Sequence, residues 1–320
     1  MTPIDFFDKL RYWNDNRCKF LNTVKYYSAV NFLSTFFANI FLPVYFKLTR
    51  NCSKNRLATV DREGPKIIVS VTSFPKRFKT LHLVIESLLR QTVKPDKIVL
   101  YLTKSQVGDV SCLPKSLLKL KDRGLCVELC EDEIRSHTKY YYAFKQFPDD
   151  IVITADDDLF YRSDFVESLL KSHRENTDCI IANWTKLIIP GKIKYTEWPD
   201  AVTPVKDKNQ LLLGVGGVLY PPHCMHTDLF DVQKIKDLAF TADDVWLTAM
   251  ALLKGTNLYF TGYKYNYLPV LIFNNETLIS GNYVRNQMWI DKINDFYKKK
   301  IGIAPFIDVP LKNLEEKGQK

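Results

Sequence analysis

Apolar runs alternate with helical patterns through the middle of the chain. Four runs have the β-branched, apolar character of buried strands, at residues 66–74, 96–103, 125–131 and 150–158. Between the first two, Leu81, Val84, Ile85 and Leu88 recur at helical spacing. This alternation predicts a largely parallel sheet with helices on both faces. Ligands of such sheets bind at the carboxyl ends of the strands, so the residues after each strand are the candidates for chemistry.

Two helices can be bounded by the residues at their ends. Pro114 and Gly124 are placed to begin and end one helix. Thr241 is placed to cap another, which Gly255 should end. A third helical pattern runs over residues 138–147 and stops before a proline.

The N-terminal part has a different pattern, with helical periodicity and no strand alternation. Its apolar run, Phe32–Phe46, is shorter than the roughly 20 residues that a membrane-spanning helix needs. Basic residues flank the run on both sides: Lys19, Lys25, Lys47, Arg50, Lys54 and Arg56. A helix lying in a membrane interface and an amphipathic helix packed on the main domain both fit this pattern.

A break at residues 61–65 separates this part from the strands. We therefore expect a helical, basic segment at residues 1–62, a catalytic domain at 63–305 and a C-terminal tail at 306–320, whose last residues, 312–320, are polar and expected to be frayed. The first residues lack a basic start followed by an apolar run, so no cleaved signal peptide is expected. The expected location is cytoplasmic, with peripheral contact to the inner face of the plasma membrane if the 32–46 helix lies in the interface.

Charge and cysteine usage narrow the class of partner. The 320-residue chain has a formal net charge of +9, which suits an anionic partner such as nucleotide phosphates or acidic lipids. No paired zinc ligands or RNA-binding aromatic signature is present, so nucleic acid is not the expected partner. The seven cysteines are odd in number and form no CxxC motif, which argues against a disulfide framework and favours a reducing compartment.

The fourth strand pattern ends in three carboxylates, within ITADDDLFY. If strand alternation continues, Asp156 and Asp158 lie on one side and Asp157 on the other. Adjacent like charges need a compensating positive charge, and a hard divalent ion that also binds phosphates would supply it. A solvated acidic turn is the alternative. A calcium loop of the EF-hand type is excluded, because Tyr161 stands where that loop needs glycine.

Basic residues follow the first strand and precede the fourth. The segment with Thr72, Phe74, Lys76 and Arg77 could hold a base and phosphates, or it could be an ordinary charged loop. Lys139 is a second candidate for nucleotide contact, although a solvated helix start also explains it.

Two later features have similar ambiguity. Gly216 and Gly217 would let the backbone approach a sugar closely, or they could mark a bend in a strand. Asp243 and Asp244 begin a helix, where carboxylates are favourable with or without a catalytic role. Trp246 could stack on a sugar face or pack in the core.

With these residues in view, the chain resembles glycosyltransferases with the A-type fold. The acidic segment resembles their DXD motif and follows three strand–helix units, where such enzymes carry it. VSVTSFPKRF at residues 69–78 resembles their first nucleotide-binding segment, and QTVKPDKIVLYL at 91–102 is similar to their second strand. The resemblance covers roughly residues 66–262 and is to bacterial family-2-like inverting enzymes of surface polysaccharide synthesis.

The resemblance implies a fold and an activity. The fold would be α/β and Rossmann-like, with a mostly parallel central sheet, helices on both faces and a helical N-terminal segment. The activity would be metal-dependent transfer of a sugar, with inversion, from a nucleotide-diphosphate donor to a glycan or lipid-linked acceptor.

The resemblance also implies roles for individual residues. Asp156 and Asp158 would bind the divalent cofactor, Mn²⁺ or Mg²⁺, and Asp244 would be the catalytic base, with Asp243 as the alternative. The Asp243–Asp244 pair is similar to the "ED" segment of inverting enzymes, with Asp in place of the usual Glu. Gly216, Gly217 and Trp246 would contact the acceptor or the sugar. The donor would contact six residues: Thr72, Phe74, Arg77, Lys139, Asp156 and Asp157.

Two rival classes are open to test. Metal-dependent phosphohydrolases and nucleotidyltransferases also place two acids after a strand, but the haloacid-dehalogenase type carries them on its first strand. An inactive sugar-binding relative would have no need for both the Asp156–Asp158 and the Asp243–Asp244 carboxylates.

Overall fold

The computed structural model describes most of the chain and divides it into two compact units. The described residues are 1–12, 26–57, 63–189, 194–263, 267–271 and 279–318. Unit 1 comprises Met1–Glu131, Asp156–Ser168 and Lys264–Asn274, and unit 2 comprises Asp132–Ala155, Leu169–Tyr263 and Asn275–Lys320. Lys19, Lys25 and the first two residues of the break at 61–65 lie outside the described residues.

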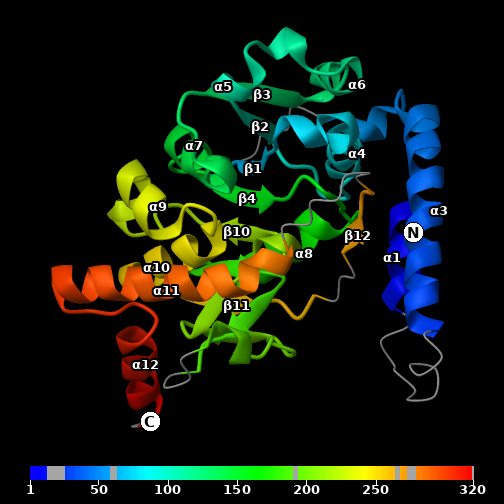
Figure 1. Cartoon of the computed structure of the whole chain (residues 1–320). Coiled ribbons are helices and arrows are strands. Elements are labelled where there is room, and N and C mark those ends of the chain that lie inside the picture. The colour runs from blue at the N-terminus through cyan, green and yellow to red at the C-terminus, as the bar shows by residue number, and fades with distance from the viewer. Residues whose placement is uncertain (13–25, 58–62, 190–193, 264–266, 272–278, 319–320) are drawn as a thin grey trace. The chain divides into compact units, whose positions relative to one another are not determined.

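Unit 1 contains three parallel strands in the order β3-β2-β1. The strands are β1 (Ile67–Thr72), β2 (Lys97–Thr103) and β3 (Leu125–Cys130). Five of the six β1 residues are buried, as expected of a continuous apolar strand that is covered on both faces. Helix α4 (Phe78–Leu88) follows β1, and the short helices α5 (Lys104–Val107) and α6 (Lys115–Leu118) follow β2 (Figure 1).

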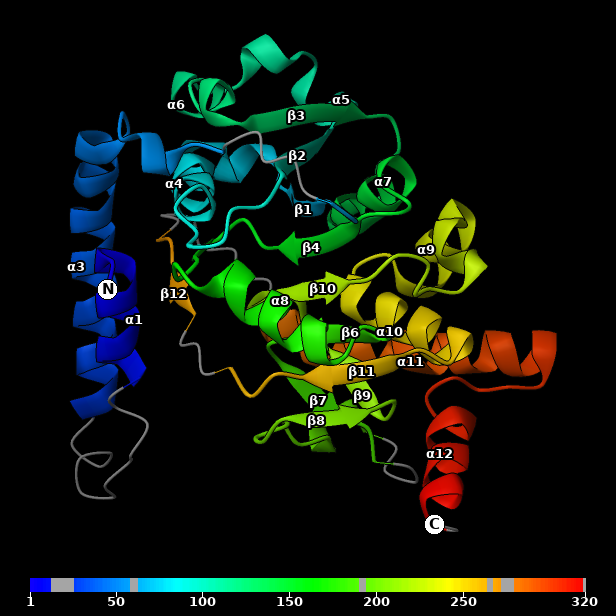
Figure 2. The same cartoon turned by 180° about the vertical axis from the view of Figure 1, so that it is seen from behind.

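Two N-terminal helices complete unit 1. Helices α1 (Pro3–Tyr12) and α3 (Tyr26–Thr49) lie side by side, drawn in blue in Figures 1 and 2. The Ser34 hydroxyl donates to the Phe7 carbonyl at 3.1 Å, and the rings of Phe7 and Phe41 lie 6.1 Å apart. The interface between the helices therefore combines an inward-facing polar group with aromatic packing.

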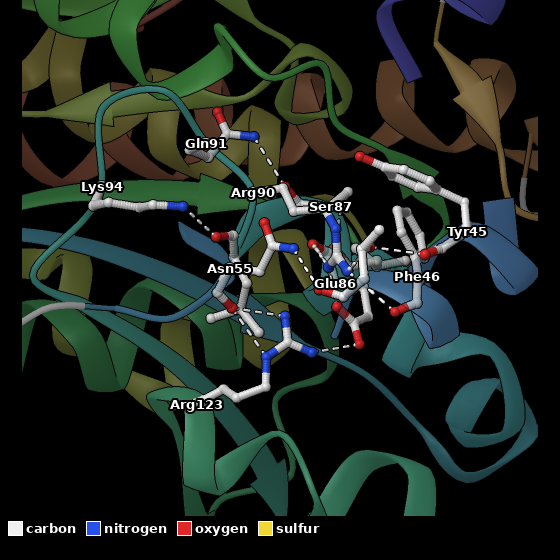
Figure 3. Close-up of polar contacts among 12 residues, drawn as sticks. Tyr45, Phe46, Asn55, Glu86, Ser87, Arg90, Gln91, Lys94 and Arg123 are labelled. Atoms are coloured by element: carbon white, nitrogen blue, oxygen red, sulfur yellow. Dashed lines mark hydrogen bonds and ion pairs between the residues drawn. The ribbon is translucent and has the colours of Figure 1, made fainter. Parts of the chain in front are cut away.

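A buried ion cluster joins α3 and α4 to the 3₁₀ turn Lys121–Arg123 that follows α6 (Figure 3). Glu86 accepts from Arg90 and from Arg123, the latter at 2.6 Å, and the three side chains are 5–9% exposed. Arg90 also donates to the Phe46 carbonyl at 3.3 Å and to the Thr49 hydroxyl at 3.1 Å, in the last turn of α3. A guanidinium there satisfies groups that a helix end leaves without an internal partner. Burial lowers the pKa of Arg90, yet an arginine stays charged at any physiological pH.

We expect Glu86→Gln to lower the free energy of unfolding by about 3–5 kcal/mol, because it leaves two buried guanidinium groups without a countercharge. Urea denaturation followed by circular dichroism measures the change. The matched control is Glu131→Gln, since Glu131 pairs with Lys104 at a site where both side chains are more than half exposed. That pair should contribute about 0–1 kcal/mol. Equal midpoints for the two variants would contradict a stabilising role for the cluster.

Unit 2 contains five strands of the main sheet in the order β4-β10-β6-β11-β8. Strands β6 and β11 pair in parallel, while β10 runs antiparallel to β4 and β6, and β8 antiparallel to β11. A separate antiparallel pair is formed by β7 and β9. The bounds are β4 (Ile151–Ala155), β6 (Cys179–Ala182), β7 (Thr185–Leu187), β8 (Val205–Asp207), β9 (Gln210–Leu212), β10 (Val218–Tyr220) and β11 (Asn257–Phe260).

The core of unit 2 is built around one helix. Helix α10 (Asp243–Lys254) is buried continuously from Val245 to Leu252, so it is covered on every side. Gly255 ends it in the left-handed conformation, at φ 79°. The other helices are α7 (Thr138–Gln146), α9 (Val232–Ala239), α11 (Ile279–Ile301) and α12 (Asp308–Gly318), while α8 (Phe165–Glu175) begins in unit 1 and ends in unit 2.

The predicted fold class, α/β with a mostly parallel central sheet, is confirmed. Three local predictions were wrong. The helix expected between Pro114 and Gly124 is the single turn α6 followed by a short 3₁₀ turn. Ala242 rather than Thr241 precedes α10, because the Thr241 hydroxyl instead accepts from the Trp289 indole at 3.0 Å. The expected frayed tail is largely helical, as α12.

Candidate active site

The loop after β1 directs a basic side chain toward the end of the strand. The backbone is extended at Phe74, and Pro75 then begins a 3₁₀ turn that leads into α4. The Thr72 hydroxyl donates to the Tyr101 carbonyl at 2.9 Å, which fixes the strand end to β2. The Arg77 guanidinium lies 5.2 Å from the centre of the Phe74 ring, within the range of a cation–π contact. Thr72 and Phe74 therefore hold the loop in the conformation that positions Arg77.

Arg77 binds the carboxylates that follow β4. One of its terminal nitrogens contacts Asp157, and the other lies 3.0 Å from Asp158 Oδ2. Burial lowers the pKa of Arg77, but the charges of Asp157 and Asp158 outweigh burial and raise it above the usual value. Burial also raises the pKa of Asp157, and Arg77 opposes this change only in part. The positive charge that three adjacent acids require is thus supplied partly by the protein itself.

This arrangement corrects the prediction from strand alternation. Strand β4 ends at Ala155, so Asp156–Asp158, termed here the acidic segment, lies beyond the sheet ladder. Asp157 is nearly buried, and Arg77 contacts both Asp157 and its neighbour Asp158 rather than one side of a strand. The residues expected to bind the donor, Arg77 and Asp157, therefore bind one another.

Two backbone contacts hold the acidic segment in place. The Asp156 amide donates to the hydroxyl of the buried Tyr161 at 2.6 Å. The Asp158 carbonyl accepts from the Val270 amide at 2.8 Å. This second contact extends an antiparallel pair between β5 (Leu159–Phe160) and β12 (Leu268–Pro269). The segment is therefore fixed by a stretch of chain more than a hundred residues away in sequence.

The acidic segment fits a metal that shares its ligands with a substrate. Among the residues that the structure describes, no group of three or more His, Cys, Asp or Glu side chains is placed to hold a metal ion. The Asp158 side chain is 36% exposed, which leaves it accessible to solutes. Hard divalent ions such as Mg²⁺ commonly bind one or two carboxylates together with substrate phosphates. Asp156 and Asp158 match that donor set, whereas a cage made of protein ligands alone does not fit.

Unit 2 contains a second charged cluster. Lys139 is 5% exposed and lies 3.1 Å from Asp243 Oδ2 at the start of α10. Burial raises the pKa of Asp243, but Lys139 and His137 outweigh it and hold the pKa below the ordinary value. His137 is fully buried, and burial lowers its pKa. Its Nε2 donates to the Ala239 carbonyl at 2.9 Å, and its Nδ1 lies 2.7 Å from the Tyr140 hydroxyl.

Asp244 is oriented by a glycine. Asp244 Oδ1 accepts from the Gly214 amide at 3.0 Å, and its carbonyl accepts from the Thr248 hydroxyl at 2.8 Å. A Cβ added at Gly214 would lie 2.9 Å from Asp244 Oδ1 and 3.5 Å from Lys139 Nζ. A side chain at position 214 would therefore require the Asp244 carboxylate to shift. The sequence analysis missed Gly214 in this role, although its position in GVGG was the available signal.

The predicted sugar-contacting residues have different surroundings. Gly216 accepts from the Asn183 side chain at 3.1 Å, and Gly217 has a φ of 83°, which favours glycine. Trp246 is completely buried in the core of unit 2, where its indole donates to the Leu229 carbonyl at 3.4 Å. Its ring is therefore not available to stack on a sugar, which corrects that prediction in favour of core packing.

Comparison with known proteins agrees with the chemistry of the acidic segment. Residues 69–211 match the model of the family described as Glycosyl transferase family 2. The match contains Arg77, Lys139 and the acidic segment and ends before Gly214 and Asp244. The match covers 143 of the 320 residues and supports a glycosyltransferase that uses a nucleotide sugar. No curated protein matches the chain by sequence.

Solved structures show more distant similarity. A mannosyltransferase from Pyrobaculum calidifontis, solved in complex with GDP-Man and Mn²⁺, is 14% identical, with a TM-score of 0.45, over 87% of this chain and 78% of that one. The S. aureus TarS 1-349 structure is 16% identical, with a TM-score of 0.42, over 62% of this chain and 59% of that one.

Proposed function

We infer that the protein transfers a sugar from a nucleoside diphosphate to a hydroxyl group of a glycan or lipid-linked acceptor, with a divalent ion and with inversion at the anomeric carbon. The observation that carries the inference is the acidic segment. Two carboxylates accessible enough to share an ion follow a buried strand, beside an arginine and inside the matched family segment. Mn²⁺ or Mg²⁺ would bind to Asp156 and Asp158 and would stabilise the negative charge of the departing diphosphate.

Arg77 supports donor binding from the same unit. Its guanidinium already carries the charge and the planar geometry that suit phosphate oxygens. Phe74 and the Thr72–Tyr101 contact restrict its position, so less conformational entropy is lost when a donor binds. Lys139 has a different part in this proposal, because it is buried against Asp243. It maintains the charge balance at the start of α10 rather than contacting the nucleotide.

Asp244 is the better of the two candidate bases. Asp243 forms an ion pair with Lys139 that holds its pKa below the ordinary value, and a carboxylate stabilised in this way is a weak base. Asp244 Oδ1 accepts from the Gly214 amide, which fixes the orientation of its carboxylate. We therefore propose proton acceptance by Asp244 and electrostatic support by Asp243.

The reaction then balances as a single displacement. The acceptor oxygen forms a bond to the anomeric carbon from the face opposite the diphosphate, and the bond from that carbon to the diphosphate oxygen breaks with its electron pair. The acceptor hydroxyl proton moves to Asp244. Because one displacement inverts the carbon, the product has the opposite anomeric configuration from the donor.

The acceptor class and location extend the same proposal. Enzymes of the kind the sequence resembles build surface polysaccharides, so a growing glycan or a lipid-linked sugar is the proposed acceptor. The nucleotide-sugar donor then favours the cytoplasm, beside the inner face of the plasma membrane.

Incubation of the full-length protein with a panel of nucleotide sugars, Mn²⁺ and oligosaccharide or lipid-linked acceptors tests the function. We expect one donor to yield both a nucleoside diphosphate and a glycosylated acceptor, and excess chelator to stop both. Free nucleoside diphosphate together with free sugar, in the presence of every acceptor, would indicate a hydrolase instead. Release of a nucleoside monophosphate would indicate phosphohydrolase chemistry and would contradict the proposal.

A further inference from the structure

Helix α3 has two faces of different character. One face is buried and contains Tyr27, Ser34, Thr35, Ala38, Leu42 and Phe46. The opposite face, termed here the outer face, has large apolar side chains that are 44–79% exposed: Phe32, Leu33, Phe36, Phe37, Ile40, Phe41, Val44 and Leu48. At the ~150–250 Å² that large side chains carry, these leave roughly 700 Å² of apolar surface in contact with water. A patch of that size on a soluble protein indicates a binding surface.

The polar groups of α3 are bonded to the rest of unit 1. Asn39, in the middle of the helix, donates to the Pro269 carbonyl at 2.9 Å and accepts from the Leu271 amide at 2.8 Å. Thr35 accepts from Arg11 of α1, and Arg90 contacts the last turn of the helix. The buried face is therefore attached to the protein at Thr35, at Asn39 and in the last turn of the helix.

This attachment determines how α3 can meet a membrane. By length and composition alone, α3 could cross a bilayer, although core helices of soluble proteins pass the same test. Here residues 31–41 of α3 contact α1, which carries Asp5, Asp8, Lys9 and Arg11. A crossing would draw those charges into the hydrocarbon region, at a cost of about 2.5 kcal/mol or more each. A helix lying in the plane of the interface exposes only its outer face to lipid.

The charges near the outer face favour anionic lipid, rather than a second copy of the chain, as its binding partner. Residues 26–57 contain no Asp or Glu, and the end of α3 and the turn after it expose Lys47, Arg50, Lys54 and Arg56. Lys47 lies three residues from Val44 and so projects from the outer face itself. Two such faces would repel one another, whereas each basic residue near an anionic bilayer contributes about 1 kcal/mol of attraction.

We propose that the outer face of α3 docks flat on a bilayer that contains anionic phospholipids. The apolar side chains enter the headgroup and upper acyl region, and the four basic residues bind the headgroups. Docking requires neither donor nor metal, so it stands or fails independently of the proposed activity.

Flotation of the full-length protein with vesicles of phosphatidylcholine and phosphatidylglycerol tests the proposal. The wild-type protein should float with these vesicles, and less with phosphatidylcholine alone or at high salt. The double variant Phe37→Glu, Ile40→Glu should reduce the partition coefficient at least tenfold. It replaces two apolar side chains with negative charges, which the anionic headgroups repel. Val202→Glu is the matched control, since Val202 is 82% exposed in unit 2 and should leave flotation unchanged.

Failure of the wild-type protein to float, or equal flotation of the double variant, would overturn the proposal. Light scattering tests the alternative that a second copy of the chain covers the outer face. If the wild type does not float but forms a concentration-dependent dimer, and the double variant does not form this dimer, the outer face is a self-association surface. The variants Phe32→Trp, Ile40→Trp and Leu48→Trp test the orientation through quenching by lipids brominated at known depths. A flat helix gives similar depths, whereas a deeper tryptophan at position 40 alone would indicate a crossing helix.

Discussion

Replacement of Asp158 by asparagine is expected to abolish metal-dependent binding of a nucleoside diphosphate and to reduce turnover by roughly 10²-fold or more. The loss follows because the amide has no charge to hold a divalent ion between protein and phosphates, and an ion at such a site contributes several kcal/mol. Asparagine keeps an oxygen that can accept from Arg77, now 3.0 Å from Asp158, so the loop should keep its fold. Calorimetric titration with and without chelator measures the effect.

The control for this variant makes the same substitution, Asp to Asn, at a nearby position in the sequence. Asp164→Asn alters a partly exposed carboxylate of the same unit, which pairs with Arg162 at 2.8 Å. It should bind the nucleotide as the wild type does. If wild-type affinity is the same with and without chelator, or if Asp158→Asn binds normally, the acidic segment does not hold a metal.

Replacement of Asp244 by asparagine is expected to lower kcat by roughly 10²–10⁴-fold and to leave donor affinity nearly unchanged, the usual effect of removing a positioned base. The amide keeps the acceptor for the Gly214 amide, so the start of α10 should persist. Gly214→Ala provides a second test of the same carboxylate. The added Cβ would lie 2.9 Å from Asp244 Oδ1 and push the carboxylate aside, so kcat should fall although the acid is still present. Steady-state kinetics on the donor identified by the panel measures both variants.

Asp237→Asn, at an exposed carboxylate on α9, is the matched control and should behave as the wild type. Near-normal turnover in a folded Asp244→Asn protein would show that another group accepts the proton. The anomeric configuration of the product gives an independent answer, since retention would exclude a single displacement whichever residue is the base.

The parts of the fold that could be predicted depend on local patterns. The strands that became β1 to β4 are continuous apolar runs, and Gly255 ends α10 because a left-handed residue is needed there. The acidic segment was found for the same reason, since three acids after an apolar strand are visible without knowledge of any distant residue.

The parts that could not be predicted depend on contacts between distant segments. Nothing near Asp158 indicates that Val270 would bind its carbonyl, because β12 is two residues long and has no strand pattern of its own. Nothing in the local sequence indicated that Arg77 and Asp157, which were both expected to contact the donor, would pair with one another. Trp246 shows that the sequence alone does not distinguish a tryptophan packed in a core from one that stacks on a sugar.

A shortened protein that begins after residue 62 would lose more than a lipid-facing helix. Asn39 holds the segment that follows β12, and that segment binds the backbone of Asp158. Removal of α3 would also leave Arg90 without its contacts to Phe46 and Thr49. Solubility and activity therefore cannot be separated by truncation in this protein. A soluble, active form should retain α3 whole and exchange the side chains of its outer face for polar ones.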